Sequence, residues 1–373
     1  MEFSNYFEPF GDQIISGAVF PLSVVDDDTD LSQVDVVIFS VCDTRWTNSA
    51  DEKHLIDNTL RCFGNLHPGN WIPRVGLLGN FVPGNEPGDT ITGLADVVKH
   101  CLQTNTIPLI LCNSNRVLVG IYKAFVKLET AVNICLCDAR IGIGVDTGGV
   151  MGEIARSQPN FLFNYSNLGY QTYFTPQAEI ELTDSLYFDA VRLGELRGNI
   201  PLTEPMIRSS EVFALSVNGL KNSDFKSANN GAPNGFYSEE ACQMMRYAGF
   251  NEKLKVATIT ELMTKSLNTV DAELLAEMIW CFLDGFYSKR AEIPEAGGKS
   301  FLKYRVSLKD DEFEIIFYKS LKTDRWWMEV PLPPAYENRY RRHRLVPCDY
   351  QDYLMATRDE IPDRWWKTYK KML

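Results

Sequence analysis

Short apolar runs alternate with helix-forming segments along the first 290 residues of this sequence, and this alternation constrains the fold more than any other feature. Each run is continuous, rich in β-branched residues and bounded by polar residues, Gly or Pro, which is typical of parallel strands buried on both faces. The predicted strands are 34–42, 73–81, 107–113, 130–138, 211–219 and 256–262. The predicted helices are 50–66, 90–104, 115–127, 184–198, 237–249 and 271–290. This order predicts an α/β fold, a three-layer α/β/α sandwich around a mostly parallel, doubly wound sheet.

The helix predicted over 237–249 has clear end signals. Ser238 is a suitable N-cap residue, and Gly249 is suited to the left-handed position that follows a helix.

From about residue 291 the pattern changes. The strings KYRVSL and FEIIFYKS, separated by an acidic turn at 309–311, predict a hairpin, and RWWMEV predicts a further strand. We therefore expect a main α/β domain over 1–290 and a C-terminal β-hairpin and aromatic extension over 291–373 that packs on it.

The charge of the chain limits its partners. A formal net charge of −12 argues against nucleic acid, because duplex binding depends on basic side chains that neutralise phosphates. The amino terminus has no basic region followed by an apolar stretch, and no window reaches the roughly 18 apolar residues of a spanning helix. We expect a cytoplasmic protein with no membrane insertion.

Nine cysteines and four histidines offer few catalytic groupings. Cys135 and Cys137 lack a second pair at zinc-site spacing, so buried structural thiols are the main interpretation. Cys112 and Cys137 lie near strand ends, where Arg140 would lower a thiol pKa, and thiol chemistry stays open as an alternative. The glycine-rich segment 144–153 lacks the Lys-Ser/Thr ending of a phosphate-binding loop and is predicted to be a connecting loop.

Polar side chains follow three of the predicted strands, in the segments IPLILCNSNR, ICLCDARIG and FALSVNGLKNSD. Ligands of open α/β sheets bind at the carboxyl ends of the strands. We therefore expect a pocket lined by Asn113, Asn115, Asp138, Arg140 and Asn218.

In order and spacing, these three segments resemble the GGDHS, DAHxD and SxDxD motifs of the arginase, agmatinase and formimidoylglutamase (ureohydrolase) superfamily. Nearly the whole chain resembles an arginase-like or formimidoylglutamase-like branch from Bacteroidota, through long strings such as FLFNYSNLGYQTYF, NGFYSEEACQMMRYAG and FYKSLKTDRWWMEVP. The resemblance implies an arginase/deacetylase-like sandwich. In the family, the motifs hold two manganese ions that generate a hydroxide for attack on a guanidino or formimino carbon.

Carrying the motifs over by position leaves few ligands in this chain. In the first motif, Ser114 and Asn115 stand where the family has aspartate and histidine. In the second, Asp138 is kept, while Arg140 takes the histidine position and Gly142 the second aspartate position.

In the third motif, Asn218 and Leu220 occupy the two aspartate positions, so one ligand of six remains. The resemblance therefore implies that the manganese site is lost and that no cofactor is bound. Arg140 carries a fixed positive charge, and we expect it to form an ion pair with Asp138 in the former metal cavity.

Two Trp pairs distinguish the extension: 326–327 and 365–366. One interpretation is that one Trp of each pair packs on the core and the other on the extension. The alternative is an exposed anchor beside a basic cluster, since Trp and Arg are enriched in binding hot spots. The residues of this predicted docking surface are Trp326, Trp327, Arg339, Arg341, Arg342 and Arg344.

These observations favour a catalytically inactive ureohydrolase-fold protein, a pseudoenzyme with a binding or scaffolding role. Its expected partners are an unidentified protein or further copies of itself in a homo-oligomer. The first alternative is a formimidoylglutamase-like or arginase-like hydrolase of amidine or amide C–N bonds. The second is a metal-free sensor that binds a small molecule in the former active-site pocket.

Overall fold

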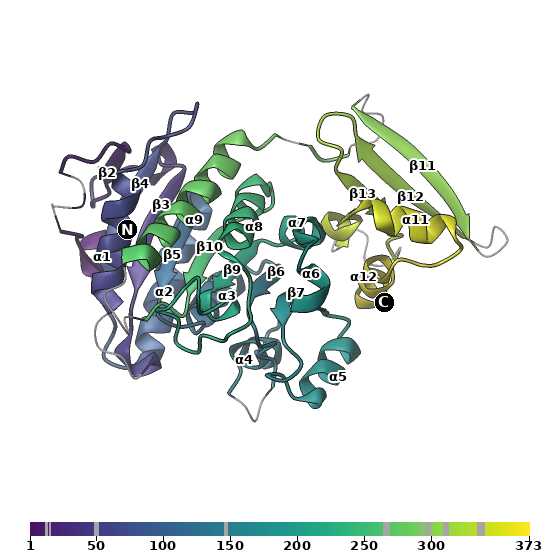
Figure 1. Ribbon diagram of the computed structural model, residues 1–373, viewed down its shortest axis with the longest axis horizontal. Coiled ribbons are helices and arrows are strands. Elements are labelled where there is room, and N and C mark those ends of the chain that lie inside the picture. Colours follow the sequence, from purple (N-terminus) through teal and green to yellow (C-terminus); the bar gives the residue numbers. More distant parts are fainter. Residues whose placement is uncertain are drawn as a thin grey trace.

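Two β-sheets of different character organise the chain in the computed structural model (Figure 1). The structure describes residues 1–11, 14, 16–47, 52–144, 148–263, 269–290, 292–294, 300–308, 313–333 and 340–373. Within these ranges the larger sheet has ten strands in the order β1-β4-β3-β5-β10-β9-β6-β7-β8, with β2 beside β4. The strands are β1 (Phe7–Glu8), β2 (Leu22–Val24), β3 (Val36–Val41), β4 (Val75–Phe81), β5 (Ile107–Cys112), β6 (Val132–Cys137), β7 (Leu162–Tyr170), β8 (Asp189–Arg192), β9 (Val212–Ser216) and β10 (Val256–Thr260).

Parallel pairing dominates this sheet. β1 runs antiparallel to β4, and the other described pairs are parallel. In the middle, β5, β10, β9 and β6 are consecutive neighbours, with Leu111 beside Ile259 and Cys137 beside Leu215. The carboxyl ends of these four strands therefore finish together at one edge.

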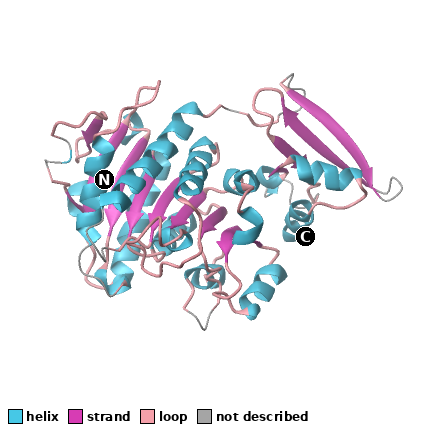
Figure 2. Cartoon of the chain, viewed as in Figure 1, coloured by secondary structure: helices cyan, strands magenta, loops and turns pink. Residues whose placement is uncertain are grey.

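Helices cover both faces of the larger sheet, as Figures 1 and 2 show, which confirms the predicted three layers. Strand residues alternate between two cores: Val36 and Ile38 pack with α1, α8 and α9, while Val37 and Phe39 pack with α2 and α3. Both sets are fully buried, which explains why the strands are continuously apolar. The helices are α1 (Glu52–Gly64), α2 (Pro87–Thr104), α3 (Val117–Lys127), α4 (Val150–Arg156), α5 (Gln177–Ser185), α6 (Leu193–Leu196), α7 (Glu204–Arg208), α8 (Ser238–Phe250) and α9 (Thr269–Ser288).

Gly249 serves helix packing, so its predicted role after the end of a helix is wrong. It lies inside α8, where a Cβ atom would stand 2.1 Å from the carbonyl oxygen of Phe282 in α9. Gly285 mirrors it, with a Cβ that would be 2.2 Å from the Arg246 carbonyl oxygen. The N-cap position is also displaced by one residue, from Ser238 to Tyr237.

All six predicted strands are present, as β3, β4, β5, β6, β9 and β10, but the helix predicted over 184–198 is wrong. α5 ends at Ser185, and the next regular segment is β8, which pairs with β7. The sequence obscured this pair because β7 carries buried polar residues. Asn164 and Ser166 donate hydrogen bonds to Asp189 at 3.0 and 3.2 Å. In the glycine-rich segment, residues 145–147 lie outside the described residues, and α4 begins at Val150.

The second sheet is antiparallel and belongs to the C-terminal part of the chain. Its strands follow one another in the order β11 (Phe301–Leu308), β12 (Phe313–Ser320), β13 (Trp326–Glu329) and β14 (Leu345–Cys348). The sequence predicted the first three; β14 and the helices α11 (Tyr350–Thr357) and α12 (Asp363–Met372) were missed. The turn at 309–311 lies outside the described residues. The sheet has its own apolar core, which includes Ile315, Phe317 and Trp365.

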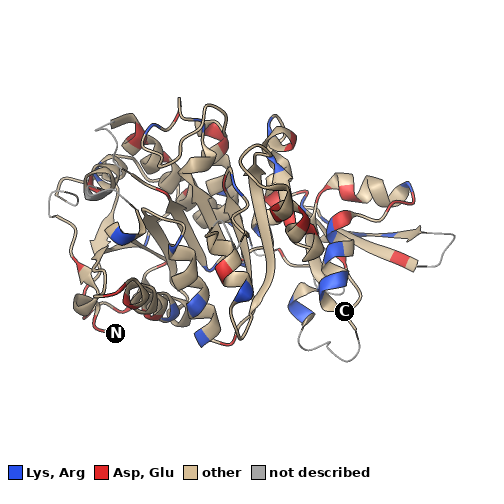
Figure 3. Ribbon diagram, turned by 90° about the horizontal axis from the view of Figure 1, so that it is seen from below, with Lys and Arg blue, Asp and Glu red and all other residues tan. Residues whose placement is uncertain are grey.

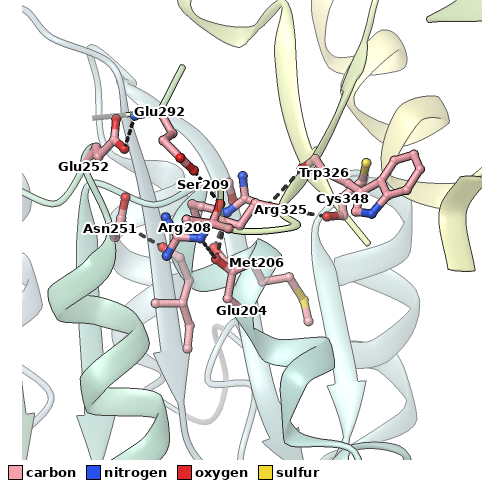
Figure 4. Close-up of polar contacts among 12 residues, drawn as sticks. Glu204, Met206, Arg208, Ser209, Asn251, Glu252, Glu292, Arg325, Trp326 and Cys348 are labelled. Atoms are coloured by element: carbon pink, nitrogen blue, oxygen red, sulfur yellow. Dashed lines mark hydrogen bonds and ion pairs between the residues drawn. The ribbon is translucent and has the colours of Figure 1, made fainter. Parts of the chain in front are cut away.

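A buried arginine joins the two parts of the molecule (Figure 4). Arg208 in α7 donates to Glu204 Oε1 at 2.8 Å and, across the joint, to the carbonyl oxygen of Trp326 at 3.0 Å. Arg325 approaches the same Glu204 oxygen from the extension at 3.1 Å. The Arg208 guanidinium also lies 4.4 Å from the ring centroid of Trp327. These contacts attach the second sheet to the larger domain.

None of the helices in the described part of the chain combines the length and the apolar character that a bilayer span requires.

Candidate functional site

Four adjacent strand ends of the larger sheet carry the candidate site. Asn115 follows β5, Asp138 follows β6, Asn218 follows β9 and Glu261 follows β10. Because these strands are parallel neighbours, the chain brings residues that are distant in sequence to one place. Asp138, Asn218 and Glu261 are at most 9% exposed.

Asn115 bridges the two carboxylates. Its side-chain Nδ2 donates to Asp138 Oδ2 at 3.0 Å, and its backbone N–H donates to Glu261 Oε1 at 2.8 Å. The Thr260 hydroxyl donates to Asn115 Oδ1 at 2.6 Å, which fixes the orientation of the amide.

Two further amides complete the environment of Glu261. Asn218 Nδ2 and Asn229 Nδ2 donate to Glu261 Oε2 at 3.1 and 3.4 Å. The Asn218 Oδ1 atom accepts the backbone N–H of Asn230 at 2.7 Å, so its amide nitrogen must face the carboxylate. With the Arg140 N–H on Asp138 Oδ1 at 2.9 Å, all four carboxylate oxygens of Asp138 and Glu261 accept hydrogen bonds from N–H groups.

Glu261 has an unusual backbone conformation, with φ of +64°. A residue with a branched or long side chain adopts this left-handed region at a cost, and such residues are concentrated at functional sites. In this conformation the Glu261 carboxylate reaches the residues that follow β5 and β9, where it accepts hydrogen bonds from Asn115 and Asn218.

Burial raises the pKa of both carboxyl groups. Removal from water is the largest influence on the pKa of Asp138, opposed by the Ser216 hydroxyl and by the hydrogen bonds from Arg140 and Asn115. The Ser216 hydroxyl is near enough to favour the ionised form, although its geometry falls short of a hydrogen bond. Burial also raises the pKa of Glu261, and the negative charge of Asp138 adds to the effect.

The structure brings together three of the five predicted pocket residues, Asn115, Asp138 and Asn218. Asn113 lies apart from them and donates to the Asp43 carbonyl oxygen at 3.1 Å. Arg140 contributes its backbone N–H and, through its charge, a smaller lowering of the pKa of Asp138; its side chain is exposed and its guanidinium lies 4.9 Å from the Phe174 ring centroid. The predicted ion pair between the Arg140 and Asp138 side chains is therefore wrong.

Sequence reasoning missed Glu261. The predicted strand runs to residue 262 and so includes Glu261, whereas β10 ends at Thr260. A signal was present, because Glu261 is the first charged residue after the apolar run that begins at Val256.

The thiol alternative loses its physical basis. Cys112 and Cys137 are fully buried, and burial raises the pKa of both thiols well above the ordinary value. A thiol needs a nearby cation and access to solvent to react as a thiolate, and Arg140 does not supply the first.

The predicted docking surface is largely built into the protein. Trp326 and Trp327 are 7% and 5% exposed, so the exposed-anchor interpretation is wrong for both. Arg342 donates to the Ala131 carbonyl oxygen, and Arg344 Nε donates to Glu329 Oε1 at 2.8 Å. Arg341 is exposed.

Of the remaining docking candidates, Arg339 lies outside the described residues. In the second Trp pair, Trp365 is buried in the apolar core of the extension and Trp366 is 40% exposed, so this pair does not divide between the core and the extension as the first interpretation expects.

The donor set of the site does not resemble a binuclear metal centre. Among the described residues, no group of three or more His, Cys, Asp or Glu side chains is arranged to hold a metal ion. The site offers two carboxylates whose oxygens already accept hydrogen bonds, whereas a manganese centre needs several carboxylates and histidines with free lone pairs.

Three solved structures illustrate what the shape of this chain is similar to. Formiminoglutamase from Trypanosoma cruzi, in a structure with Mn²⁺, has a TM-score of 0.63 at 16% identity and covers 71% of this chain and 97% of its own. Formimidoylglutamase from Bacillus subtilis has a TM-score of 0.62 at 12% identity, over 76% of this chain and 95% of its own. Agmatine ureohydrolase from Thermoplasma volcanium has a TM-score of 0.58 at 15% identity, over 72% and 95%.

No protein-family model and no curated protein matches this sequence. The narrower resemblance to a Bacteroidota branch stays a prediction. The nearly complete coverage of three ureohydrolase structures, together with the order of the parallel strands, identifies the fold of this chain as that of the arginase superfamily.

Proposed function

We propose that this protein is a ureohydrolase-superfamily pseudoenzyme, which keeps the scaffold, lacks the binuclear manganese site and has a binding or scaffolding role. The observation that carries the proposal is the closed hydrogen-bond network at the strand ends. Each oxygen of Asp138 and Glu261 accepts an N–H, and the amides of Asn115 and Asn218 face them.

The chemistry of amides supports this proposal. An amide NH₂ group donates hydrogen bonds and cannot ligate a cation, and the amide oxygens of Asn115 and Asn218 are both occupied by other donors. A dication at this place would have to break these contacts and would find only two carboxylates to balance its charge.

Metal content and hydrolysis test the proposal directly. Protein produced with added Mn²⁺ is expected to contain no stoichiometric manganese and to leave formimidoylglutamate, agmatine and arginine intact. An active ureohydrolase assayed in parallel serves as the positive control. About two manganese ions per chain, or hydrolysis that disappears in Asp138→Asn, would overturn the proposal in favour of the C–N hydrolase alternative.

A sensor function is the second candidate, but in a different pocket from the predicted one. An open cavity of about 530 Å³ lies at the ends of β7 and β8, and none of the five predicted pocket residues lines it. Its lining includes Gln171, whose backbone N–H donates to the Ala139 carbonyl oxygen at 2.9 Å, and two arginines, Arg192 and Arg197. The two guanidinium groups suit a carboxylate ligand.

Thermal unfolding in the presence of formimidoylglutamate or glutamate tests the sensor function. A saturable rise in melting temperature that is lost in Arg192→Ala and kept in Arg305→Ala, an exposed arginine of the extension, would support it. Equal shifts in both variants would contradict it.

For the binding role, we propose the extension as the surface that meets a protein partner or a second copy. Arg341, Arg342 and Arg344 are all exposed, but Arg344 pairs with Glu329 and Arg342 holds the extension to the core, so Arg341 is the member best suited to charge reversal. Loss of an interaction, or of self-association measured by light scattering, in Arg341→Glu supports this surface. An unchanged interaction contradicts it.

A further inference from the structure

A cavity of about 40 Å³ lies between the larger domain and the extension, and most of its charged residues are basic. This volume holds a few water molecules or one small ion. Among the charged lining residues, Lys253, Arg364, Lys367 and Lys371 are cations and Asp189 is the single anion. Figure 3 shows that basic residues are gathered along α12, which supplies three of the four cations.

Both parts of the molecule contribute to this cavity. Lys253, Asp189, Asn133 and Asn164 come from the larger domain, whereas His343 and the α12 residues come from the extension. A ligand in the cavity would therefore contact both.

The cations have incomplete partners. The Lys253 ammonium group has no hydrogen bond or ion pair with any residue that the structure describes. Arg364 donates to the Leu202 carbonyl oxygen at 3.4 Å, while its Nη1 atom is buried without a partner. Lys367 donates to the Phe188 carbonyl oxygen at 3.1 Å and lies 3.7 Å from Asp189 Oδ1, and Lys371 donates to Asn164 Oδ1.

His343 adds a neutral donor. It is 6% exposed and stacks on Phe163 with ring centroids 3.5 Å apart. Its Nε2 atom accepts the Arg342 Nε–H at 3.0 Å, so Nδ1 carries the proton of the neutral ring. Burial and the nearby cations lower the pKa of His343 to about 2, which keeps the ring neutral.

Two acidic groups outside the cavity face these cations. Glu211 lies near Lys253 and Arg342, and Asp352 lies near Arg364; burial raises the pKa of both carboxyl groups. Burial lowers the pKa of Lys371 to about 8 and also lowers the pKa of Lys253, as expected where positive charges are crowded in a partly dry space.

We propose that this cavity binds a small oxyanion, with hydrogen phosphate as the best fit, and that the anion fastens the extension to the larger domain. An oxyanion accepts hydrogen bonds from Lys253, Lys371 and the free Arg364 Nη1 and neutralises their charge. Asn133 Oδ1, on a residue that lines the cavity, is buried without a hydrogen-bond donor. The P–O–H group of hydrogen phosphate supplies such a donor, which acetate and sulfate lack at neutral pH.

Thermal unfolding at constant ionic strength tests the proposal with inorganic phosphate against chloride, acetate and sulfate. We expect a saturable rise in melting temperature with phosphate, larger than with sulfate or acetate. The rise should disappear in Lys253→Met and Lys371→Met. The rise should persist in Lys370→Met. Lys370 is on the same helix, but its ammonium group lies 4.6 Å from the centroid of the Trp366 ring.

Hydrogen exchange adds a local readout. Phosphate should slow exchange in β14 and α12 of the full chain, and Lys253→Met should abolish this protection. Lys253→Met removes a half-buried cation whose ammonium group forms no hydrogen bond or ion pair with the described residues, and it is expected to fold, so the test does not depend on Lys371→Met.

Each other outcome counts against the proposal. No phosphate effect, or the same effect in Lys253→Met and Lys370→Met, would overturn it, because the salt would then act on the whole surface. A larger shift with acetate would overturn the assignment of phosphate and point to a carboxylate.

Discussion

Asn115 places its side-chain amide 3.0 Å from Asp138 Oδ2 and its backbone N–H 2.8 Å from Glu261 Oε1, so one residue joins two buried carboxylates. The three residues follow three different strands of the larger sheet. Two carboxylates near each other raise each other's pKa, and donors between them lower the repulsion. The amide network therefore supplies hydrogen-bond donors to both buried carboxylates at these strand ends.

Asn115→Asp tests this network. The variant sets a third carboxylate against Asp138, removes the NH₂ donor and creates like-charge repulsion in a buried place. We expect a loss of about 1–3 kcal/mol in the free energy of unfolding at pH 7, measured by urea denaturation. The loss should shrink as the pH is lowered, because burial raises the pKa of Asp138 and Glu261 and protonation of either acid removes part of the repulsion.

Addition of Mn²⁺ to Asn115→Asp supplies a sharp control. If the strand ends retained a latent metal site, Mn²⁺ would restore the stability of the variant. We expect no restoration, and recovery at stoichiometric metal would contradict the pseudoenzyme proposal.

The raised pKa of Asp138 predicts a pH dependence of stability. In the window between its unfolded and its folded pKa, the folded protein binds more protons than the unfolded chain. The contribution of Asp138 to stability is therefore present at low pH and is lost as the pH rises through that window. Unfolding measured from pH 4 to pH 8 should show Asp138→Asn gaining stability relative to the parent as the pH increases. A constant difference would contradict the raised pKa.

Arg208 is predicted to be the strongest single polar contact between the two parts. Arg208→Met keeps the apolar volume but leaves the carbonyl oxygen of Trp326 without its donor and leaves Glu204 with Arg325 alone. We expect a loss of about 3–5 kcal/mol in the free energy of unfolding, because one partner of a buried pair is removed.

The exposed pair of Arg305 with Glu314, at 3.5 Å, gives the matched control. Arg305→Met should change the free energy of unfolding by only about 0–1 kcal/mol. Equal effects of the two substitutions would show that the Arg208 contacts between the larger domain and the extension, drawn in Figure 4, contribute little to the free energy of unfolding.

The contact of α8 with α9 depends on Gly249. A Cβ atom would lie 2.1 Å from the Phe282 carbonyl oxygen, so Gly249→Ala must separate the helices. We expect a loss of about 1–3 kcal/mol by thermal or urea unfolding. Gly88→Ala, in α2 with open space around the added methyl group, should be neutral or stabilising by about 0.5 kcal/mol. A mild effect of Gly249→Ala would mean that the helices move apart easily.

The sequence predicted the parallel core well because its strands are buried on both faces and read as continuous apolar runs, as Ile38 and Phe39 illustrate. It failed at β7 and β8, where Asn164 and Asp189 are buried as hydrogen-bonded partners and interrupt the apolar pattern. A hydrogen bond between residues 25 positions apart leaves no local signal.

At the candidate site, Asn115, Asp138 and Asn218 were predictable because each lies within three residues of the carboxyl end of a strand and falls in a segment that resembles a family motif. The position of the Arg140 side chain was not predictable, because no local sequence signal indicates that it lies over Phe174. Asp138 is instead hydrogen-bonded by the Asn115 amide. Trp326 was misjudged for a similar reason: its cover comes from Tyr304, Tyr350 and Tyr353, which lie on two other elements of the extension.

Burial of the strand-end thiols predicts that they do not react in the native protein. Cys112 and Cys137 are 0% exposed, and burial raises the pKa of both, so neither forms a thiolate near neutral pH. Native protein treated with iodoacetamide at pH 8 should keep both thiols unmodified by peptide mass spectrometry, while the partly exposed Cys62 serves as the internal control for reagent access. In urea all of these thiols should be labelled. Rapid labelling of Cys112 in the native state would mean that the strand ends open to solvent, and it would revive the thiol alternative that the closed network around Asp138 and Glu261 argues against.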